Sequence, residues 1–578
     1  MQKKYWLLLL FTTVAISFFA YLFHYPVQII FYHIHVCFII LFISNLINKK
    51  IKNKKIKASF NAFVFFMFSV FYTSVFVSNN AYQQTLNIPL IAAFIKDINS
   101  YNSLLPISAY LILLLAFFYY LCLLGIFYKF DKDNTQVKYS KAIKLSIITL
   151  IALLIWKKRD YQKEEEPIIT MLFGDTSSSI FMTKKRADIG LKDIQEKEQF
   201  TDTLTNKKNV IIILVDALRA ENTTMYGYKR KTSPFLQQLY DDKKIIKVKN
   251  AVATCACSEC GVASMLFSKN WANIGYNGFS LVGLLKKVGF QTHFVLSGYS
   301  KNWSPIYDFF KTDLNSYAEN EGGFALGDDE SVIYGLNNLK IDYNKPQFFY
   351  LHLMSAHKAG IKHKKFEHFT PTMMMRDLAK TKSDFEKVFN YYDNGVIQAD
   401  NYIQRIFKIL EQKKILDKAV VIICADHADA LGEHGLTGHV NHLYNSVNRI
   451  PIFIYDNNFS KYKNTTFWRQ IDIAPTITDV LGLKIPKCWQ GKSALQNKIE
   501  PYSYHQTSVK RNTQYSIIKN TDSAIYKLLI EKSENKMQLF NIKKDSNELN
   551  NLINKPNYLP IKNELIQKFK TEFNTQFE

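Results

Sequence analysis

The sequence predicts two unlike parts: a multi-pass α-helical membrane domain followed by an α/β domain with a mainly parallel central sheet. The first 156 residues are rich in long apolar runs, although mean hydropathy over all 578 residues is only −0.11. Beyond about residue 205, short β-branched runs alternate with amphipathic helical stretches, a pattern typical of a parallel sheet covered on both faces. We therefore expect a membrane domain at 1–158, a linker at 159–205 and an extramembrane domain at 206–578.

Five apolar runs in the first part predict membrane-spanning helices. A helix needs about 20 residues to cross the hydrocarbon core of a bilayer, and the first four runs meet this length while the fifth is short. A cleaved signal peptide would explain the first run and none of those that follow. The predicted spans are 5–23, 26–47, 60–78, 106–128 and 142–156.

Loop charges predict the orientation of these spans, because Lys and Arg are retained on the cytoplasmic side. The lysine-rich segment 49–57 and the loop 129–144 should be cytoplasmic, whereas the loop 79–105 contains one lysine and should lie outside. An odd number of spans then leaves everything after about residue 160 outside the cytoplasm. The basic cluster at 157–159 disagrees locally with this orientation.

The formal net charge of +24 has two interpretations. One is an ordinary solvated, lysine-rich surface. The other is attraction to an anionic membrane, where each basic group near the bilayer contributes on the order of 1 kcal/mol. Nucleic acid is not an expected partner, because the lysines are dispersed and no nucleic-acid-binding module is visible.

Polar residues follow several predicted strands of the second part, at the point where each strand ends. Asp216 ends one strand, His357 follows another, and Asp426 and His427 close a third. In parallel sheets the functional groups gather at the carboxyl ends of the strands. The predicted strands are 210–215, 292–296, 348–354, 420–425 and 451–455.

Each of these polar residues has an ordinary explanation when taken alone. Asp216 is at a position where it could cap the next helix, and His427 could be a buried histidine with one hydrogen bond. Together with Asp426 they offer carboxylate oxygens and an imidazole nitrogen, the donors that zinc accepts with one position left open for substrate. The combination predicts a metal site built on these three residues.

The segment 254–267 offers candidate nucleophiles for such a site. Its small and polar residues suit a turn that leads into a helix, whose N-terminal N–H groups would favour an anionic phosphate. A hydroxyl there becomes a good nucleophile only when its pKa is lowered, for example by a metal. The segment also contains Cys255, Cys257 and Cys260, and a Cys255–Cys260 bridge is one pairing that the sequence leaves open.

The residues around the first predicted ligand carry a family resemblance. The run 209–222, followed by 226–234, resembles the first block of phosphoethanolamine transferases, which are membrane-anchored members of the alkaline phosphatase superfamily. The zinc ligand of this block is usually Glu preceded by Gly, whereas this chain has Val215 and Asp216. Asp is common in the wider superfamily, so the resemblance implies that Asp216 keeps the role of a metal ligand.

Later blocks extend the resemblance over most of residues 205–555. The run 425–435 is similar to the family motif Ser-Asp-His-Gly-Glu-Ser-Leu-Gly-Glu, in which the adjacent Asp and His, here Asp426 and His427, are zinc ligands. The resemblance implies that His357 and His439 contact phosphate or a second metal. The neighbouring His434 and His442 are interpreted as surface residues. The runs 470–481 and 536–552 resemble late blocks of sulfatase-like domains, the second usually forming a closing antiparallel strand and turn.

The family's nucleophile is normally a Thr located four residues after a disulfide-forming Cys. Counted from Cys255, this position is Glu259, which cannot form an alkoxide. Ser258 is the nearest hydroxyl and is our predicted nucleophile and fourth metal contact. Cys257 is the competitor, because sulfatases convert a Cys to formylglycine, but the Pro and Arg of the sulfatase signature are missing here. Thr254 remains a further alternative.

The resemblance implies a zinc enzyme, with one or two ions or another divalent metal. It would transfer phosphoethanolamine from phosphatidylethanolamine, through a covalent intermediate, to lipid A, lipopolysaccharide or a glycan. Such an enzyme would be a monomer in the bacterial inner membrane, with its sulfatase-like catalytic domain in the periplasm. The alternatives are a phosphoglycerol transferase, a metal-dependent phosphatase or phosphodiesterase, and an inactive envelope scaffold protein.

Overall fold

The computed structural model divides the chain into two compact units, Met1–Ser179 and Ile180–Glu578, and each is described by itself. The described residues of the first unit are 47, 50–82, 117–125 and 128. Those of the second are 184–275, 278–298, 306–319, 327–374, 379, 381–439, 442–496, 500–507, 514–532 and 535–573.

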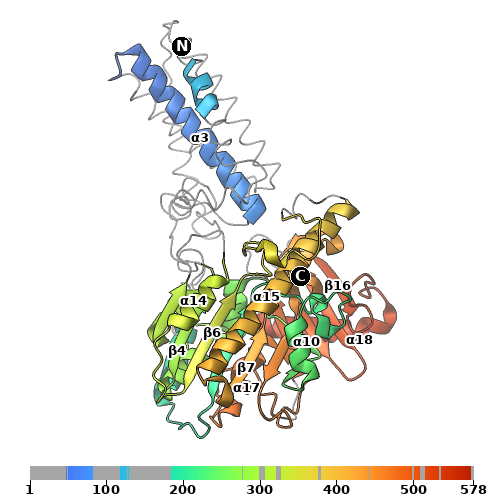
Figure 1. Ribbon diagram of the computed structural model, residues 1–578. Helices are drawn as coiled ribbons and strands as arrows, with labels where there is room; N and C mark the ends of the chain where they lie inside the picture. The colour runs from blue at the N-terminus through green and yellow to red at the C-terminus, as the bar shows by residue number, and fades with distance from the viewer. Residues whose placement is uncertain are drawn as a thin grey trace. The chain divides into compact units, whose positions relative to one another are not determined.

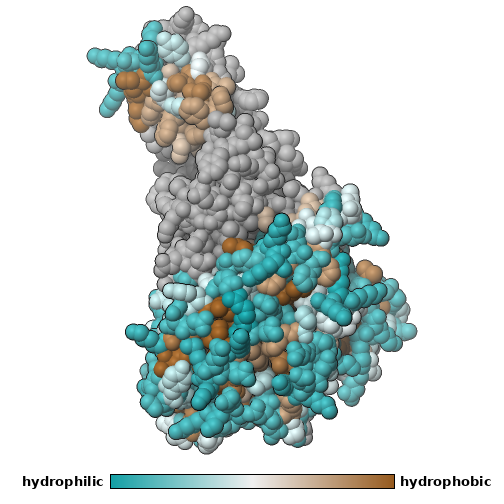
Figure 2. Space-filling model, viewed as in Figure 1, coloured by the Kyte–Doolittle hydropathy of each residue, from teal (hydrophilic) through white to brown (hydrophobic). Residues whose placement is uncertain are grey.

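The first unit contains the long helix α3 (Lys54–Tyr82), which overlaps the predicted span 60–78. Apolar side chains such as Phe63 and Met67 are exposed on it, and brown atoms mark this surface in Figure 2. Among the residues that the structure describes, no helix is both long and apolar enough to cross a membrane. The other four predicted spans lie wholly or in large part outside the described residues.

The second unit is built on a central sheet whose strands run in the order β2-β11-β7-β1-β6-β4-β5 (Figure 1). Strands β7, β1, β6, β4 and β5 are mutually parallel, whereas β11 is antiparallel to both of its neighbours. The sheet is therefore mainly parallel, as predicted, but the predicted strand at 451–455 runs in the opposite direction. The strands are β1 (Asn209–Val215), β2 (Ile245–Lys247), β4 (Gln291–Leu296), β5 (Ser316–Glu319), β6 (Gln347–Leu353), β7 (Ala419–Cys424) and β11 (Ile452–Tyr455).

Helices cover both faces of this sheet. Every residue of β6 and β7 is buried, and successive side chains of a strand point to opposite faces, so both faces must be covered. Helix α15 packs against α10 and α14 in front of the sheet in Figure 1, while α11 packs against α12 and α17. The helices are α10 (Pro234–Asp241), α11 (Ser258–Phe267), α12 (Leu281–Lys287), α14 (Glu330–Asn338), α15 (Lys382–Gln412) and α17 (Ile473–Val480).

A second, four-stranded sheet follows towards the C-terminus and is antiparallel in the order β13-β14-β15-β16. Helix α18 (Leu559–Phe573) packs on it through the buried Leu565 and Phe569. The last strand of this sheet, β16, lies within the predicted closing block 536–552. The strands are β13 (Tyr502–Gln506), β14 (Gln514–Asn520), β15 (Ile525–Glu531) and β16 (Lys536–Asn541).

Short elements connect the two sheets. A three-stranded sheet runs in the order β10-β3-β12, and β8 pairs with β9. The one-turn helix α16 (Asn445–Asn448) leads directly into β10. These strands are β3 (Asn250–Val252), β8 (Ala430–Leu431), β9 (Thr437–Gly438), β10 (Arg449–Ile450) and β12 (Phe467–Arg469).

Helix α9 (Lys184–Gln199) lies within the linker that we predicted at 159–205. Asp193 of α9 pairs with Lys269 at 2.6 Å, and both side chains are almost completely buried. Lys197 pairs with Asp313 at 2.8 Å. Charged residues of α9 therefore form ion pairs with the rest of the second unit. Because the helix is polar, its composition alone resembles that of a linker.

Candidate metal centre and active site

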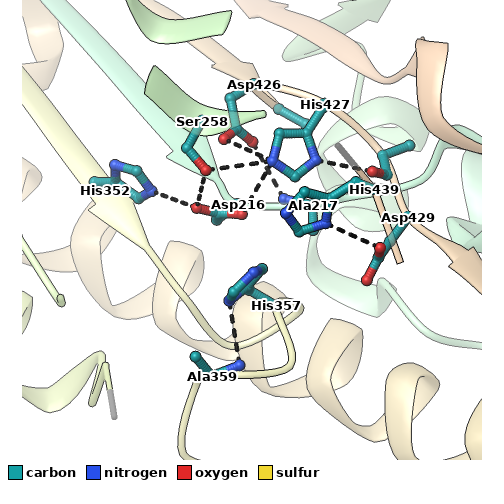
Figure 3. A network of polar contacts seen from close by, with 12 residues as sticks. Asp216, Ala217, Ser258, His352, His357, Ala359, Asp426, His427, Asp429 and His439 are labelled. Atoms are coloured by element: carbon teal, nitrogen blue, oxygen red, sulfur yellow. Dashed lines mark hydrogen bonds and ion pairs between the residues drawn. The ribbon is translucent and has the colours of Figure 1, made fainter. Parts of the chain in front are cut away.

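The predicted ligands meet at the carboxyl ends of two neighbouring parallel strands. Asp216 follows β1, and Asp426 and His427 follow β7, which pairs with β1. One ligand atom from each of the three residues lies within 4.8 Å of the others, and all three residues are buried. Figure 3 shows their side chains pointing toward one another. The strand-end pattern thus placed these residues together, as expected.

Two carboxylate oxygens of this cluster accept no hydrogen bond from the described part of the chain. They are Oδ1 of Asp216 and Oδ2 of Asp426, and both are buried. The other oxygens are partnered: Oδ1 of Asp426 accepts from the Ala217 N–H at 3.2 Å, and Oδ2 of Asp216 accepts two side-chain hydrogen bonds. An unpaired buried carboxylate oxygen is costly unless a cation or donor faces it. The residues therefore fit a bound metal ion.

The histidine of the cluster presents its second ring nitrogen to these oxygens. Nδ1 of His427 lies 2.8 Å from the carbonyl oxygen of Ala428, so we assign the proton to Nδ1. Nε2 then faces the carboxylates, 3.3 Å from Oδ2 of Asp426 and 3.8 Å from Oδ1 of Asp216. Two carboxylates and one imidazole are a donor set that zinc accepts at catalytic sites, with a fourth position open.

The electrostatics of the cluster are asymmetric. Burial by itself raises the pKa of Asp216, but His357, His352 and His427 together lower it below its ordinary value. Burial and the charge of Asp216 both raise the pKa of Asp426. Burial lowers the pKa of His427, yet the two carboxylates raise it overall. Without a cation the site favours one ionised carboxylate, and a divalent ion would allow both to ionise.

Ser258 lies beside the cluster as the first residue of α11 (Figure 3). Its hydroxyl donates to Oδ2 of Asp216 at 3.0 Å and lies 3.3 Å from Nε2 of His427. Glu259, the position reached by counting from Cys255, follows it in the first turn of the helix. The hydroxyl that we predicted as the nucleophile is therefore within reach of the predicted metal ligands.

A disulfide and a close helix contact fix the segment around this serine. Cys255 is bonded to Cys260, which settles the pairing that the sequence left open, while Cys257 is not in a disulfide. A Cβ atom on Gly261 would lie only 2.5 Å from the carbonyl oxygen of Asp426. Glycine at this position lets α11 closely approach the loop that carries Asp426 and His427 (residues 425–430), called the ligand loop below.

The residue after Asp216 has an unusual backbone conformation. Ala217 has φ 60°, a left-handed conformation that costs a non-glycine residue about 1–2 kcal/mol. Its carbonyl accepts a hydrogen bond from the Tyr392 hydroxyl at 2.7 Å, and that hydroxyl accepts from the Arg219 N–H at 2.9 Å. These contacts hold the turn that directs the Ala217 N–H at Asp426.

His352 was not predicted from the sequence as a member of the site. Its Nε2 lies 3.2 Å from Oδ2 of Asp216, and its Nδ1 lies 3.1 Å from the Tyr350 hydroxyl. Strand β6 pairs with β1 so that His352 is opposite Leu214, close to the end of β1. The sequence feature that could have indicated this role is the presence of His352 in the same block, 351–357, as His357.

The two predicted phosphate-contacting histidines lie next to the metal cluster. The ring centroids of His357 and His439 are 5.4 Å apart, and those of His427 and His439 are 4.0 Å apart. Nδ1 of His439 lies 3.0 Å from Oδ1 of Asp429, a residue that we did not predict. Burial lowers the pKa of His357 to about 3, so this ring is neutral and its Nδ1 accepts from the Ala359 N–H at 3.2 Å.

The two remaining histidines of this region behave differently from each other. His434 is exposed, as predicted, and stacks on Tyr444 with ring centroids 3.9 Å apart. His442 is only 4 % exposed, so its interpretation as a surface residue is wrong. It is buried because the segment after β9 folds inward, where Leu443 and Val447 join an apolar cluster.

Comparison with known proteins identifies the class of this domain. Residues 208–483 match the sulfatase family, and residues 432–575 match the family described as N-sulphoglucosamine sulphohydrolase, C-terminal. The chain therefore carries a sulfatase-family domain, and this family consists of enzymes.

The more particular relatives include transferases and sulfatases. Phosphoethanolamine transferase EptA of Helicobacter pylori is 25% identical over 286 residues, which are 47% of this chain and 53% of the relative. An arylsulfatase of Clostridium perfringens is 28% identical over 179 residues, 29% of this chain and 36% of the relative. The chain thus spans about half the length, or less, of these relatives. The match to EptA confirms the resemblance to phosphoethanolamine transferases.

A solved structure supports the fold alone. The protein BT4656, in complex with its substrate D-glucosamine-2-N,6-O-disulfate, aligns with a TM-score of 0.53 at 16% identity. The alignment covers 64% of this chain and 98% of that protein. The α/β architecture of the second unit is therefore that of the sulfatase fold.

Proposed function

We propose that this protein is a metal-dependent phosphoethanolamine transferase that works through a covalent intermediate on Ser258. The observation that carries the proposal is the position of the Ser258 hydroxyl, 3.0 Å from Asp216, in a cluster where two carboxylate oxygens accept no hydrogen bond from the residues that the structure describes. The similarity to EptA supports transfer of phosphoethanolamine, and the similarity to an arylsulfatase fits the shared fold.

Asp216, Asp426 and His427 would hold the metal, with the Ser258 hydroxyl at the open position. Zinc is the proposed ion because the donors are two carboxylates and one imidazole, although one or two ions or another divalent metal would fit the same reaction. A bound ion would supply Lewis-acid stabilisation and would lower the pKa of the hydroxyl.

In the first step, Oγ of Ser258 attacks the phosphorus of phosphatidylethanolamine. The bond from phosphorus to the diacylglycerol oxygen breaks, and that oxygen takes up a proton equivalent to the one that Ser258 gives up, so diacylglycerol leaves as a neutral alcohol. The hydroxyl donates a hydrogen bond to Oδ2 of Asp216, which orients Oγ for the attack. The N-terminal N–H groups of α11 favour the phosphate, and His357 and His439 are placed to contact it.

In the second step, an oxygen of the acceptor attacks the same phosphorus, the bond from phosphorus to Oγ breaks, and Oγ takes up a proton, which regenerates the Ser258 hydroxyl. The acceptor class is lipid A, lipopolysaccharide or an envelope glycan. A lipid donor and a lipid-linked acceptor agree with the predicted membrane domain, and we propose the bacterial inner membrane with the second unit in the periplasm. All proposed site residues come from one chain, so a monomer is sufficient.

The test is a transfer assay with the full chain in zinc-supplied vesicles that contain lipid A. Phosphatidylethanolamine labelled in ethanolamine and phosphatidylglycerol labelled in its headgroup are supplied in separate reactions. We expect label to reach lipid A from phosphatidylethanolamine only, and to remain on Ser258 when lipid A is omitted. Mass spectrometry of the peptide 255–267 would detect this adduct.

Matched variants decide between the nucleophiles and between the alternative functions. Ser258→Ala should abolish both the adduct and transfer, whereas Cys257→Ala should keep them. Label from phosphatidylglycerol would indicate a phosphoglycerol transferase, and release of the free headgroup phosphate would indicate hydrolysis. Transfer that survives Ser258→Ala would rule out the proposed intermediate, and no reaction in any arm would favour an inactive scaffold.

A further inference from the structure

Helix α16 touches both halves of the proposed site through backbone hydrogen bonds. The Ala428 N–H, next to the ligand His427, donates to the carbonyl of Val447 at 2.8 Å. The Ala253 N–H donates to the carbonyl of Asn448 at 2.8 Å, and the Asn448 side chain donates back to the Ala253 carbonyl at 3.2 Å. Ala253 begins the segment that leads to Ser258. The position of α16 therefore sets the spacing between the ligand loop and the nucleophile segment.

The first residue of α16 is held by polar groups from β15 and from the turn that follows β16. Oε2 of Glu548 accepts the Asn445 N–H at 2.6 Å, and the Ser546 carbonyl accepts from the Asn445 side chain at 3.0 Å. Nζ of Lys527, on β15, donates to Oδ1 of Asn445 at 3.3 Å and forms an ion pair with Oε1 of Glu548 at 2.8 Å. Three separate contacts therefore converge on one residue.

This ion pair is completely enclosed, with 0% of the Lys527 side chain and 1% of the Glu548 side chain exposed. Removing two charges from water is so costly that an apolar pair of similar volume is often equally or more stabilising. Stability alone is therefore a poor explanation of the pair. The specific contribution of the pair is to orient α16, because Glu548 presents a hydrogen-bond acceptor to one backbone N–H, that of Asn445.

An apolar cluster joins the same parts of the molecule. It contains Ala256 of the nucleophile segment, Ala430 of the ligand loop, Val447 of α16, and Leu529 and Phe540 of the C-terminal sheet. Apolar contacts are not directional and tolerate sliding, whereas hydrogen bonds are directional. The cluster holds these parts together, and the polar contacts at Asn445 fix how they are aligned.

We propose that Lys527 and Glu548 are positioning residues: through α16, the C-terminal sheet sets the distance between Ser258 and His427. The pair touches no reacting atom and acts by holding Asn445. This role rests on the proposed function where catalysis is concerned, but the alignment of α16 can be tested without any substrate or metal.

The experiment compares two double variants of the full chain. Lys527→Met/Glu548→Gln and Lys527→Met/Glu548→Leu both remove the buried ion pair, but only Gln retains an oxygen for the Asn445 N–H. Hydrogen exchange at the Ala253 and Ala428 amides in metal-free protein reports the alignment of α16. We expect about tenfold faster exchange at both amides in the Leu variant, and exchange within about twofold of the natural chain in the Gln variant.

Catalysis gives the second readout. In the Leu variant kcat should fall about tenfold or more with KM within about twofold, because small displacements of reacting groups slow the chemical step. The Gln variant should keep most of kcat. If the natural chain transfers no headgroup, the exchange measurement still tests the positioning role, so the two proposals fail separately.

Two further variants keep the test decisive. Asn445→Pro removes the N–H that Glu548 accepts, and proline is tolerated here because Asn445 is the first helical residue after an extended Tyr444. Asn445→Pro should show the faster exchange and the lower kcat that we expect of the Leu variant, and it replaces that variant in the test if the Leu variant does not fold. Lys519→Met/Glu564→Leu removes an ion pair of 2.6 Å between β14 of the same sheet and helix α18, and should change neither readout. Equal exchange and equal kcat in the Gln and Leu variants, or the same losses in this control, would overturn the proposal.

Discussion

Two groups of buried acids in the second unit are partnered in opposite ways. The metal cluster has Asp216 and Asp426, each with one oxygen that accepts no hydrogen bond in the described part of the chain. The α15 acids, Asp393 and Asp400, have partners on both oxygens. All four residues are buried, so exposure does not distinguish them.

The partners of the α15 acids explain what these residues do. Asp393 accepts hydrogen bonds from Asn222, Tyr228 and Arg230 at 2.7–2.8 Å. Asp400 accepts the first N–H groups of α10, from Phe235 at 2.7 Å and from Leu236 at 3.0 Å. These acids connect α15 to the segment that follows β1, and their bonding is complete without any other molecule.

The comparison indicates how buried acids of the two kinds can be distinguished. An acid whose oxygens are all satisfied stabilises one arrangement of the chain, and its removal leaves donors unpaired. An acid with an unpartnered oxygen is incomplete until a cation arrives, and its removal relieves repulsion in the metal-free protein. Neutralising Asp426 should therefore not destabilise the metal-free protein, whereas truncating Asp393 should destabilise it.

Asp426→Asn should have the largest effect on activity and no cost in stability. The amide keeps an oxygen for the Ala217 N–H but removes one charge from beside Asp216. Loss of the metal would cost several kcal/mol of transition-state stabilisation, or about a thousandfold in rate. Zinc titration, a headgroup-transfer assay and thermal unfolding of the metal-free protein measure the three quantities. Unchanged zinc affinity would contradict the ligand assignment.

Asp400→Asn should change how stability depends on pH. Burial raises the pKa of Asp400 to about 7, far above its ordinary value. The folded chain therefore holds this proton more tightly than the unfolded chain does. The contribution of Asp400 to stability is complete below pH about 3.9 and is lost as pH rises through about 7. A pKa rise of about three units corresponds to about 4 kcal/mol at most.

The amide that replaces the Asp400 carboxyl cannot ionise, so the variant should gain stability relative to the natural chain as pH rises. Urea unfolding at pH 5 and pH 8 gives the difference in the free energy of unfolding. Parallel pH curves for the two proteins would show that Asp400 keeps an ordinary pKa, in which case its two backbone hydrogen bonds outweigh burial.

Asp393→Ala should destabilise the second unit by about 3 kcal/mol, because it leaves three donors without their acceptor. The Arg230 side chain is 35% exposed and can regain water, which limits the loss. Chemical denaturation measures the change, and Asp393→Asn, which keeps an acceptor oxygen, is the control. Zinc affinity should stay within about twofold in the folded variant, whereas a large loss of zinc would remove the distinction between the two groups.

Ala217→Gly should have the smallest effect. Glycine adopts φ 60° without steric cost and keeps the N–H that Asp426 accepts, but it loses more conformational entropy on folding. We expect the free energy of unfolding to rise by at most about 1 kcal/mol, with unchanged zinc affinity. A loss of stability would mean that the turn is not strained by its alanine.

The clustering of the proposed ligands could be predicted from the sequence because it depends on local rules. Asp216, Asp426 and His427 each follow a short, apolar, β-branched run, and the ends of parallel strands meet at one edge. Ser258 was predicted from the family resemblance, as the hydroxyl nearest to the position that corresponds to the family's nucleophile. The placement of these residues required no knowledge of distant contacts.

Other features depend on pairing between distant segments and were not predictable in the same way. The contact of His352 with Asp216 requires the β1–β6 register, and the reversed direction of β11 requires its pairing with β7. An apolar run has the same composition in either direction, so its pattern does not encode orientation. His442 looked polar and exposed because its burial depends on the apolar cluster of the C-terminal sheet.

The ion pair between α9 and the loop after α11 has a practical consequence for anyone who isolates the second unit. A protein that starts at residue 206 would lack Asp193, and Lys269, which is only 6% exposed when α9 is present, would lose its 2.6 Å partner. Removing α9 would give the Lys269 ammonium access to water, so the loss is that of the buried ion pair and of the close packing of α9, whose Gly190 backbone lies against Gly275. Expression of a soluble fragment should therefore begin before Lys184, and a failure of shorter fragments to fold would reflect this cut.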